Sequence, residues 1–244
     1  LVATETVALR KIIGITIAVS LELPIFPLVL VFAFLSGVIL LAEVLNRIIT
    51  SEAELTRKVV HIGAGNVILI AWWFEIPPWM GVGAAVLAAI IALLSYFLPI
   101  LPSINSVGRK SLGTFFYAVS MGILIAWFFP DTPQYAAIGI LTMAWGDGMA
   151  ALVGQNFGRH PYTLFGSTKS WEGSLTMAMV SYLICWSILL AVEGNFWQIW
   201  LIPMIIAVTA TSFEAISKLG VDNLTVPLVS GGLSFLFVQA LIYS

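Results

Sequence analysis

The chain has 244 residues, of which 60% are hydrophobic and only 9% are charged, and its formal net charge is −2. Soluble domains are typically about 45–50% apolar and about 25% charged, and the mean hydropathy here is +1.05. These values exclude a water-soluble enzyme, a disordered chain and a nucleic-acid-binding protein. The single cysteine, Cys185, has no partner for an internal disulfide. We therefore expect an integral membrane protein.

Long apolar stretches recur along the whole chain, and several reach the roughly 17–25 residues that cross a bilayer. They predict an all-α, polytopic membrane protein with about eight transmembrane helices in one bundle. The expected helices cover 25–46, 59–74, 79–101, 112–129, 134–157, 174–192, 196–213 and 224–243. A weaker ninth segment, 12–23, could span the membrane or lie in its interface. We accordingly divide the chain into an N-terminal segment, 1–24, and a transmembrane domain, 25–244.

From residue 25 onward, basic residues occur only in alternate connections between these expected helices. The connections that carry them contain Arg47, Arg57, Lys58, Arg109, Lys110, Arg159, Lys169 and Lys218. The intervening connections contain Glu75, Asp131 and Glu193 but no lysine or arginine. Because positively charged loops stay on the cytoplasmic side, the basic face is predicted to be cytoplasmic.

The first polar cluster lies at the start of the second expected helix. Arg57 and Lys58 precede His61 by four and three residues, so one helical face can present all three. Membrane anchoring by positive charge explains either cation, but not His61 and Asn66, which continue the polar line into the membrane. Cations at a helix N-terminus oppose the helix dipole, and a bound phosphate would remove that conflict. A second basic pair, Arg109 and Lys110, is explained by anchoring alone but could complete a positively charged cup.

Asp147 is the most informative residue of the chain. It stands about 13 residues into its expected helix, or about 20 Å deep at 1.5 Å per residue. An ionised carboxylate inside the bilayer is costly unless a cation meets it, so Asp147 indicates a buried ion pair or a functional site. Small residues repeat every four positions around it and predict a close helix-packing seam: Gly146, Ala150, Gly154 and Gly158. Gly148 could also loosen the helix beside the carboxylate.

Further charged residues follow at the same predicted face. No G-x-x-x-x-G-K-S/T sequence is present, so a Walker-type nucleotide grip is absent. Lys169 offers a cation for phosphate, and Glu172 offers a metal ligand, although Glu172 would also favour the helix dipole. Glu214 lies near the cytoplasmic end of the expected helix at 196–213, and Asp222 or Asn223 is placed to cap the last one.

Acidic and basic residues from distant segments thus converge on one membrane face. Carboxylates together with substrate phosphates are the usual ligands of Mg²⁺. Cations and Mg²⁺ are also what phosphoryl transfer requires, because its catalysis is mostly positioning and charge neutralisation. A transporter, by contrast, would place its polar residues near the midplane in two related halves.

The order of these motifs resembles the CTP-dependent polyprenol kinases, a family that includes dolichol, farnesol and phytol kinases. The matching motifs are R-K-x-x-H, then G-D-x-x-A-x-x-x-G-x-x-x-G-R, then K-S-x-E-G-S, then E followed by D-N-x-x-V-P. The short, all-membrane architecture is most similar to the phytol kinases. The resemblance implies transfer of the γ-phosphoryl group of CTP to phytol, with Mg²⁺, in a photosynthetic membrane and on a route to tocopherol. A related signature occurs in the CTP:phosphatidate cytidylyltransferases, so nucleotidyl transfer is the alternative chemistry.

We assign provisional roles on this basis. Asp147 and Asp222 are expected to hold Mg²⁺ on the nucleotide, with Glu172 or Glu214 as a further ligand. The base that accepts the alcohol proton is left open among Asp147, Glu214 and His61. The residues expected to contact the nucleotide are Arg57, Lys58, Asn66, Arg109, Lys110, Arg159, Lys169 and Asn223.

Overall fold

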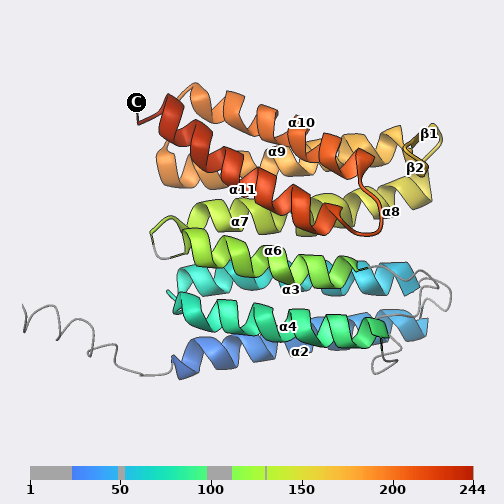
Figure 1. The fold of residues 1–244 in the computed structure, drawn as a ribbon, viewed down its shortest axis with the longest axis horizontal. Coiled ribbons are helices and arrows are strands. Elements are labelled where there is room, and N and C mark those ends of the chain that lie inside the picture. Colours follow the sequence, from blue (N-terminus) through green and yellow to red (C-terminus); the bar gives the residue numbers. More distant parts are fainter. Residues whose placement is uncertain (1–23, 49–52, 98–111, 130, 244) are drawn as a thin grey trace, which may run out of the picture.

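The computed structural model describes residues 24–48, 53–97, 112–129 and 131–243. These residues form antiparallel helical rods that run back and forth along one direction (Figure 1). The helices are α2 (Ile25–Ile48), α3 (Ala53–Trp73), α4 (Pro78–Phe97), α6 (Gly113–Phe128), α7 (Pro133–Leu141), α8 (Gly148–Phe157), α9 (Trp171–Glu193), α10 (Gln198–Ile216) and α11 (Asp222–Leu241). The predicted all-α bundle is therefore confirmed.

Length and hydropathy identify the helices that can cross a membrane. Within the described ranges, six are long and apolar enough: α2, α4, the continuous rod from α7 to α8, α9, α10 and α11. Helix α6 is apolar but has only 16 residues, so the predicted count of about eight spans is approximate. The weak segment 12–23 and Arg109 with Lys110 lie outside the described residues. The division of the chain at residue 24 stays a prediction.

The rod from α7 to α8 forms the centre of the bundle. In its membrane-spanning stretch 72% of the residues are buried, against 6% in α2. The rod is therefore the core helix of the bundle rather than a lipid-facing one. Helices α3, α6, α9 and α11 all contact it, and Tyr135, Ile138 and Met143 are fully buried within it. A side chain at Gly139 would meet the Pro227 carbonyl oxygen at 2.4 Å, so α11 can approach only because residue 139 is glycine.

This central rod is not a regular α-helix throughout. Between α7 and α8 lies a π-helical segment, η1 (Thr142–Asp147), which ends at the buried carboxylate. The N–H of Gly148 donates to the carbonyl groups of Ala144 and Trp145. A π segment inserts an extra residue into the helical turn and often occurs at functional sites. The backbone is therefore widened immediately before Gly148, the position at which the sequence predicts a loosened helix.

A small β-hairpin, which the sequence analysis did not predict, follows α8. Strands β1 (Pro161–Leu164) and β2 (Ser167–Ser170) pair antiparallel, with Tyr162 opposite Lys169. Phe165 and Gly166 form the turn with φ values of 49° and 79°, as a two-residue type I′ turn requires. Ser170 then caps α9, because its Oγ accepts a hydrogen bond from the Gly173 N–H at 3.1 Å. The hairpin thus fixes β2 directly at the N-terminus of α9.

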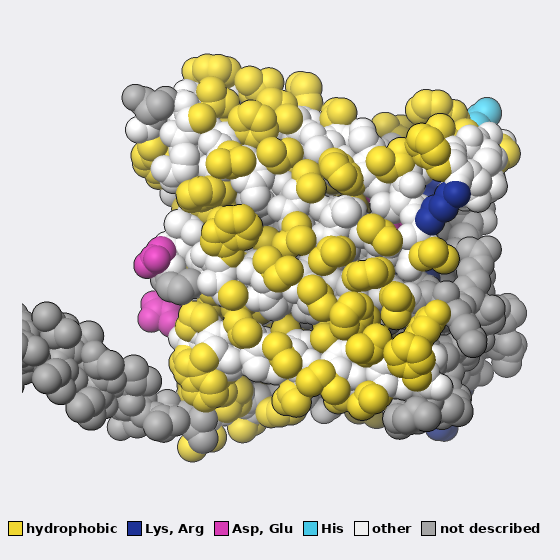
Figure 2. Space-filling model, in the orientation of Figure 1, with side chains coloured by type: hydrophobic (Ala, Val, Ile, Leu, Met, Phe, Trp, Pro, Cys, Tyr) yellow, Lys and Arg dark blue, Asp and Glu magenta, His cyan; other side chains and the backbone are white. Residues whose placement is uncertain are grey.

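Charged residues separate to the two ends of the bundle (Figure 2). We call one end the basic end, because the connections and helix ends there hold Arg47, Arg57, Lys58, Arg159, Lys169 and Lys218. The opposite, acidic end has the connections with Glu75, Asp131 and Glu193. This segregation follows the predicted alternation of basic and non-basic connections. The compartment that each end faces stays a prediction.

Candidate active site

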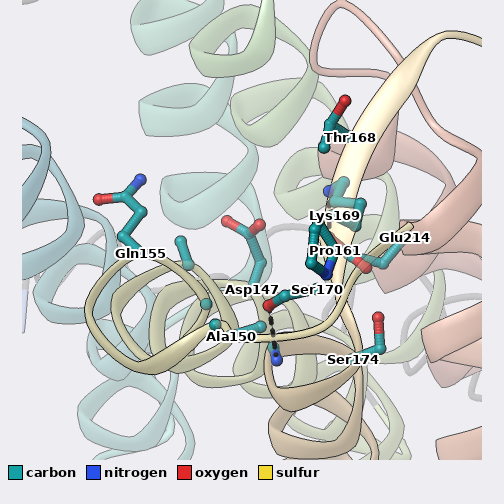
Figure 3. Close-up of a pocket in the computed structure, with 13 residues that line it drawn as sticks. Asp147, Ala150, Gln155, Pro161, Thr168, Lys169, Ser170, Ser174 and Glu214 are labelled. Carbon is teal, nitrogen blue, oxygen red and sulfur yellow. Dashed lines mark hydrogen bonds and ion pairs between the residues drawn. The ribbon is translucent and has the colours of Figure 1, made fainter. Parts of the chain in front are cut away.

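A cavity of about 360 Å³ opens at the basic end, between α8, the hairpin, α9 and α10. Its polar lining consists of Asp147, Gln155, Thr168, Lys169, Ser170, Ser174 and Glu214. Figure 3 shows the Asp147 carboxylate pointing into the space between Gln155 on one side and Lys169 on the other. Residues from four separate segments of the sequence therefore share one cavity.

Asp147 is buried and forms an ion pair with Lys58 of α3. The Lys58 ammonium contacts Asp147 Oδ2, and His61 Nε2 lies 3.9 Å from the same oxygen. The His61 ring in turn stacks on Tyr117 of α6, with 4.2 Å between ring centroids. The buried carboxylate is thus neutralised by cationic and polar groups of α3. The sequence offered two interpretations of Asp147, a buried ion pair or a functional site. The ion pair is present, and the carboxylate also faces the cavity.

Lys169 forms the second ion pair of the cavity, with Glu214 near the C-terminal end of α10. Burial lowers the pKa of the Lys169 ammonium, but the adjacent Glu214 carboxylate outweighs this effect and raises the pKa above its ordinary value. The lysine is therefore charged throughout the neutral range. Asp147 and Asp222 also act electrostatically on Lys169. One cation thus lies within the influence of three carboxylates.

Asp222 lies beside the cavity rather than in its lining. Its charge interacts with those of Asp147 and Lys169, while its Oδ1 accepts hydrogen bonds from the backbone and side-chain N–H groups of Asn223 at 3.1 and 3.2 Å. The predicted capping role is wrong: α11 begins at Asp222 itself, and the capping position is Val221, without a side-chain hydrogen bond. The Asn223 side-chain amide donates a hydrogen bond to the Gly220 carbonyl oxygen and so stabilises the turn before α11.

Glu172 does not line the cavity. Its carboxylate contacts His160 Nδ1 at 2.6 Å and accepts a hydrogen bond from the His160 backbone N–H at 3.3 Å. The side chain therefore ties the start of α9 to the residue before the hairpin. Of the two carboxylates that the sequence offered as a further ligand, Glu214 is the one in the cavity lining.

Three other predicted nucleotide contacts lie away from the cavity lining. Asn66 donates to the Ile62 carbonyl group at 2.9 Å and accepts from Trp145 Nε1 at 3.2 Å, so it joins α3 to η1. Arg57 and Arg159 are exposed at the basic end. Neither arginine lines the cavity, whereas Lys169 does.

The small residues around Asp147 form the predicted packing seam. A side chain at Gly146 would meet Met177 Sδ at 2.6 Å, and one at Gly154 would meet Ser170 Oγ at 3.0 Å. On the facing helix, a side chain at Gly173 would lie 3.0 Å from the Ala150 carbonyl oxygen. Helices α8 and α9 are therefore in close contact along one wall of the cavity.

Several polar residues of the cavity lining received no functional role in the sequence analysis, although Ser174 belongs to the K-S-x-E-G-S motif. Gln155 follows Asp147 by eight residues, so the helical repeat through Ala151 would have placed it on the same face. Ser174 is held by Tyr162 of β1 at 2.5 Å between their oxygens. Tyr117 lies outside the cavity lining, and it has no sequence signal because only the folded structure brings it to His61.

The donor set fits a metal that arrives with phosphate ligands rather than a site built from protein alone. Within the described ranges, no group of three or more His, Cys, Asp or Glu residues could hold an ion. Asp147 and Glu214 nevertheless place two carboxylates around one cavity. Mg²⁺ typically takes one or two carboxylates, water and substrate phosphates.

Comparison with known proteins identifies relatives along most of the chain. A phytol kinase from Synechocystis sp. is 55% identical over 198 residues, which are 81% of this chain and 85% of that protein. Phytol kinase 1, chloroplastic, from Arabidopsis thaliana is 29% identical over 201 residues, covering 75% of this chain and 64% of that protein. A probable phytol kinase, chloroplastic, from Triticum aestivum is 28% identical over 205 residues, covering 76% and 68%. No family model and no solved structure matches the chain.

Proposed function

The chain belongs to the phytol kinase family, and on that premise we propose that it transfers the γ-phosphoryl group of CTP to phytol in a Mg²⁺-dependent reaction. The products would be phytyl phosphate and CDP. The observation that carries this proposal is the convergence of Asp147, Lys169 and Glu214 on one cavity at the basic end of an apolar helical bundle. Groups suited to phosphoryl transfer would then lie where a membrane-dissolved alcohol can reach them.

Lys169 is the cation best placed to receive the triphosphate. It lines the cavity, it is charged, and its partner Glu214 comes from a different element. A phosphate group in the cavity would compete with Glu214 for the ammonium, because lysine binds phosphate oxygens as a compact point charge. Asp147 or Glu214 would hold Mg²⁺, which would supply neutralisation of the phosphate charge. Asp222 adds negative charge beside this group.

The alcohol would approach from the apolar surface of the bundle, with its isoprenoid tail along the helices and its hydroxyl at the cavity. In the transfer, the alcohol oxygen forms the new bond to the γ-phosphorus. The bond between that phosphorus and the β–γ bridging oxygen breaks, and CDP keeps the electron pair. A carboxylate of the cavity, Asp147 or Glu214, accepts the hydroxyl proton. Glu214 becomes available for this role once Lys169 has moved to the phosphate.

We further propose that the basic end faces the cytoplasm or its plastid equivalent. The segregation of lysine and arginine supports this orientation. The chloroplastic names of the plant relatives support a photosynthetic membrane.

The test uses purified protein, Mg²⁺ and nucleotides labelled either in the γ-phosphoryl group or in the base. CTP, UTP and ATP are each offered with phytol, farnesol, geranylgeraniol and diacylglycerol, and with phosphatidate for the alternative chemistry. We expect γ-label on phytol and release of labelled CDP, with the fastest turnover for the pair of CTP and phytol. Removal of Mg²⁺ with a chelator should abolish the transfer.

The same assay separates the alternative. Transfer of base label to phosphatidate with release of pyrophosphate would show a cytidylyltransferase and would contradict the proposal. Failure to phosphorylate any of the alcohols with any of the nucleotides would also contradict the proposal.

A further inference from the structure

The two lysines of the site, Lys58 and Lys169, differ in their relation to the cavity. Lys169 lines the cavity, and 26% of its side chain is exposed. Lys58 does not line it, only 7% of its side chain is exposed, and none of the described residues of α3 contributes to the lining. The sequence analysis gave both lysines the same role at the nucleotide phosphates. The structure separates them.

The contacts of Asp147 show what Lys58 does. The Lys58 ammonium and the His61 ring both approach Oδ2 of the carboxylate. Among the described residues, Oδ1 has neither a hydrogen-bond nor an ion-pair partner, and the carboxylate points into the cavity (Figure 3). One oxygen is therefore occupied from the α3 side, and the other is left for whatever the cavity holds.

A move of Lys58 to the nucleotide would leave the buried Asp147 carboxylate without its cation. Lys58 and Asp147 are 89 positions apart in sequence, and both side chains are almost fully enclosed. Breaking such a pair is strongly destabilising, because it leaves a buried charge uncompensated. Lys169 faces a smaller cost, because it is partly exposed and already borders the space that a phosphate would enter.

We infer that Lys58 is a positioning residue that holds Asp147 in its catalytic orientation, and that Lys169 is the phosphate-binding lysine. Lys58 fixes the side-chain rotamer of Asp147 and compensates its charge within the bundle, so that Oδ1 is presented to the reactants. It stays on Asp147 throughout the reaction. This inference rests on the proposed kinase function and assigns a role that the phosphate-neutralising interpretation of Lys58 does not contain.

The kinetic constants of three single variants test the inference. Lys58→Met removes the charge and keeps the length of the side chain, and Lys169→Met does the same in the cavity. Loss of a partner that orients a site ligand typically costs about 10–100-fold in activity. For Lys58→Met we therefore expect kcat to fall by about that factor with the KM for CTP unchanged. For Lys169→Met we expect the KM for CTP to rise at least about 10-fold.

Arg47→Met is the matched control, because Arg47 is a basic-end cation whose partner is the exposed Glu43. For this variant, kcat and the KM for CTP should both stay at the wild-type values.

A further variant covers the case in which Lys58→Met does not fold. Lys58→Arg keeps the ion pair but brings a larger, planar group to Asp147, so it should displace the carboxylate and lower kcat without changing the KM for CTP. A raised KM for CTP with kcat retained, in either Lys58 variant, would overturn the inference and leave the kinase function intact. Absence of any alcohol phosphorylation by the wild-type protein would instead overturn the kinase function, and the inference with it.

Discussion

Asp147 has a structural role in the bundle and, in the proposed reaction, a chemical one. It compensates Lys58 inside the bundle, and it faces the cavity that Lys169 and Glu214 also line. Buried ion pairs contribute little net stability, because desolvation offsets the attraction. Retention of such a pair in an apolar bundle is therefore better explained by the site than by the stability of the fold.

Replacement of Asp147 separates these two roles. Asp147→Asn should lower kinase turnover by at least about 100-fold, because the amide can neither hold Mg²⁺ as a carboxylate does nor accept the proton. It should also destabilise the protein by about 3–5 kcal/mol, since Lys58 is left as an unpaired buried cation. Turnover and thermal unfolding are measured on the same detergent-solubilised sample.

The double variant Lys58→Met with Asp147→Asn serves as the folding control. It removes both charges, so it should recover most of the lost thermal stability while turnover stays low. Substantial turnover in a folded Asp147→Asn protein would remove the carboxylate from the chemistry.

Phe165 holds a strained backbone conformation at the hairpin turn. Its φ of 49° lies in the left-handed region, which bulky residues rarely adopt. Asparagine tolerates this region much better, and left-handed geometry costs other residues roughly 1–2 kcal/mol. Phe165→Asn should therefore raise the free energy of unfolding by about 1 kcal/mol, measured by thermal unfolding. Leu164→Asn, which alters an exposed apolar residue in the adjacent extended strand, should give no such gain. Equal shifts for the two variants would show that strain is not the cause.

At the level of elements, the site depends on the close approach of α8 and α9. At Gly173 an added Cβ would contact the Ala150 carbonyl oxygen at 3.0 Å and Gly154 Cα at 3.4 Å. Both of those atoms belong to backbone, so a helix must shift to relieve the contact. The seam therefore sets the distance between α8 and α9, and with it the position of the cavity wall that these two helices form.

Substitution in the seam tests this dependence. Gly173→Ala should lower the stability of the protein by about 1–3 kcal/mol, the usual cost of overpacking. Gly232→Ala, in α11 with open space around the added Cβ, should be neutral or raise stability by up to about 1 kcal/mol, the difference in helix propensity. The melting temperatures of both variants in the same detergent provide the comparison. A Gly173→Ala protein as stable as the Gly232→Ala protein would contradict the close packing.

The sequence predicted these elements unevenly, for physical reasons. The helices follow from long apolar runs, and the seam follows from the four-residue repeat of Gly146, Ala150 and Gly154, because both signals are local. The partner of Asp147 could not be predicted, since the Lys58 contact depends on how α3 packs against η1. The hairpin strands have four residues each, too few to show an alternating pattern. The capping prediction failed because the helix begins at Asp222 itself rather than after it.

At the level of the whole molecule, charge and apolar surface are arranged for a protein that lies across a membrane. Apolar side chains cover most of the face of the bundle seen in Figure 2, and lysine and arginine gather at the end that carries the cavity. A water-soluble nucleotide can reach that end directly, and an isoprenoid alcohol can reach it along the lipid-facing helices. The orientation of this end relative to the cell is therefore part of the function.

Cysteine labelling tests the predicted orientation. The natural Cys185 is fully buried, so single cysteines can be introduced at exposed Thr163 in the hairpin and exposed Asn195 between α9 and α10. In intact spheroplasts of a bacterial host, a membrane-impermeable maleimide should label Asn195→Cys only. In inverted vesicles it should label Thr163→Cys only. The reverse pattern would place the cavity outside the cytoplasm, away from CTP.

The most direct measurement of the central claim is an experimental structure of the protein with Mg²⁺ and a non-hydrolysable CTP analogue. We predict triphosphate density in the cavity lined by Asp147, Lys169 and Glu214, with Lys169 moved from Glu214 to a phosphate oxygen and Lys58 still on Asp147. A triphosphate bound elsewhere, with the Lys169–Glu214 pair intact, would contradict the account.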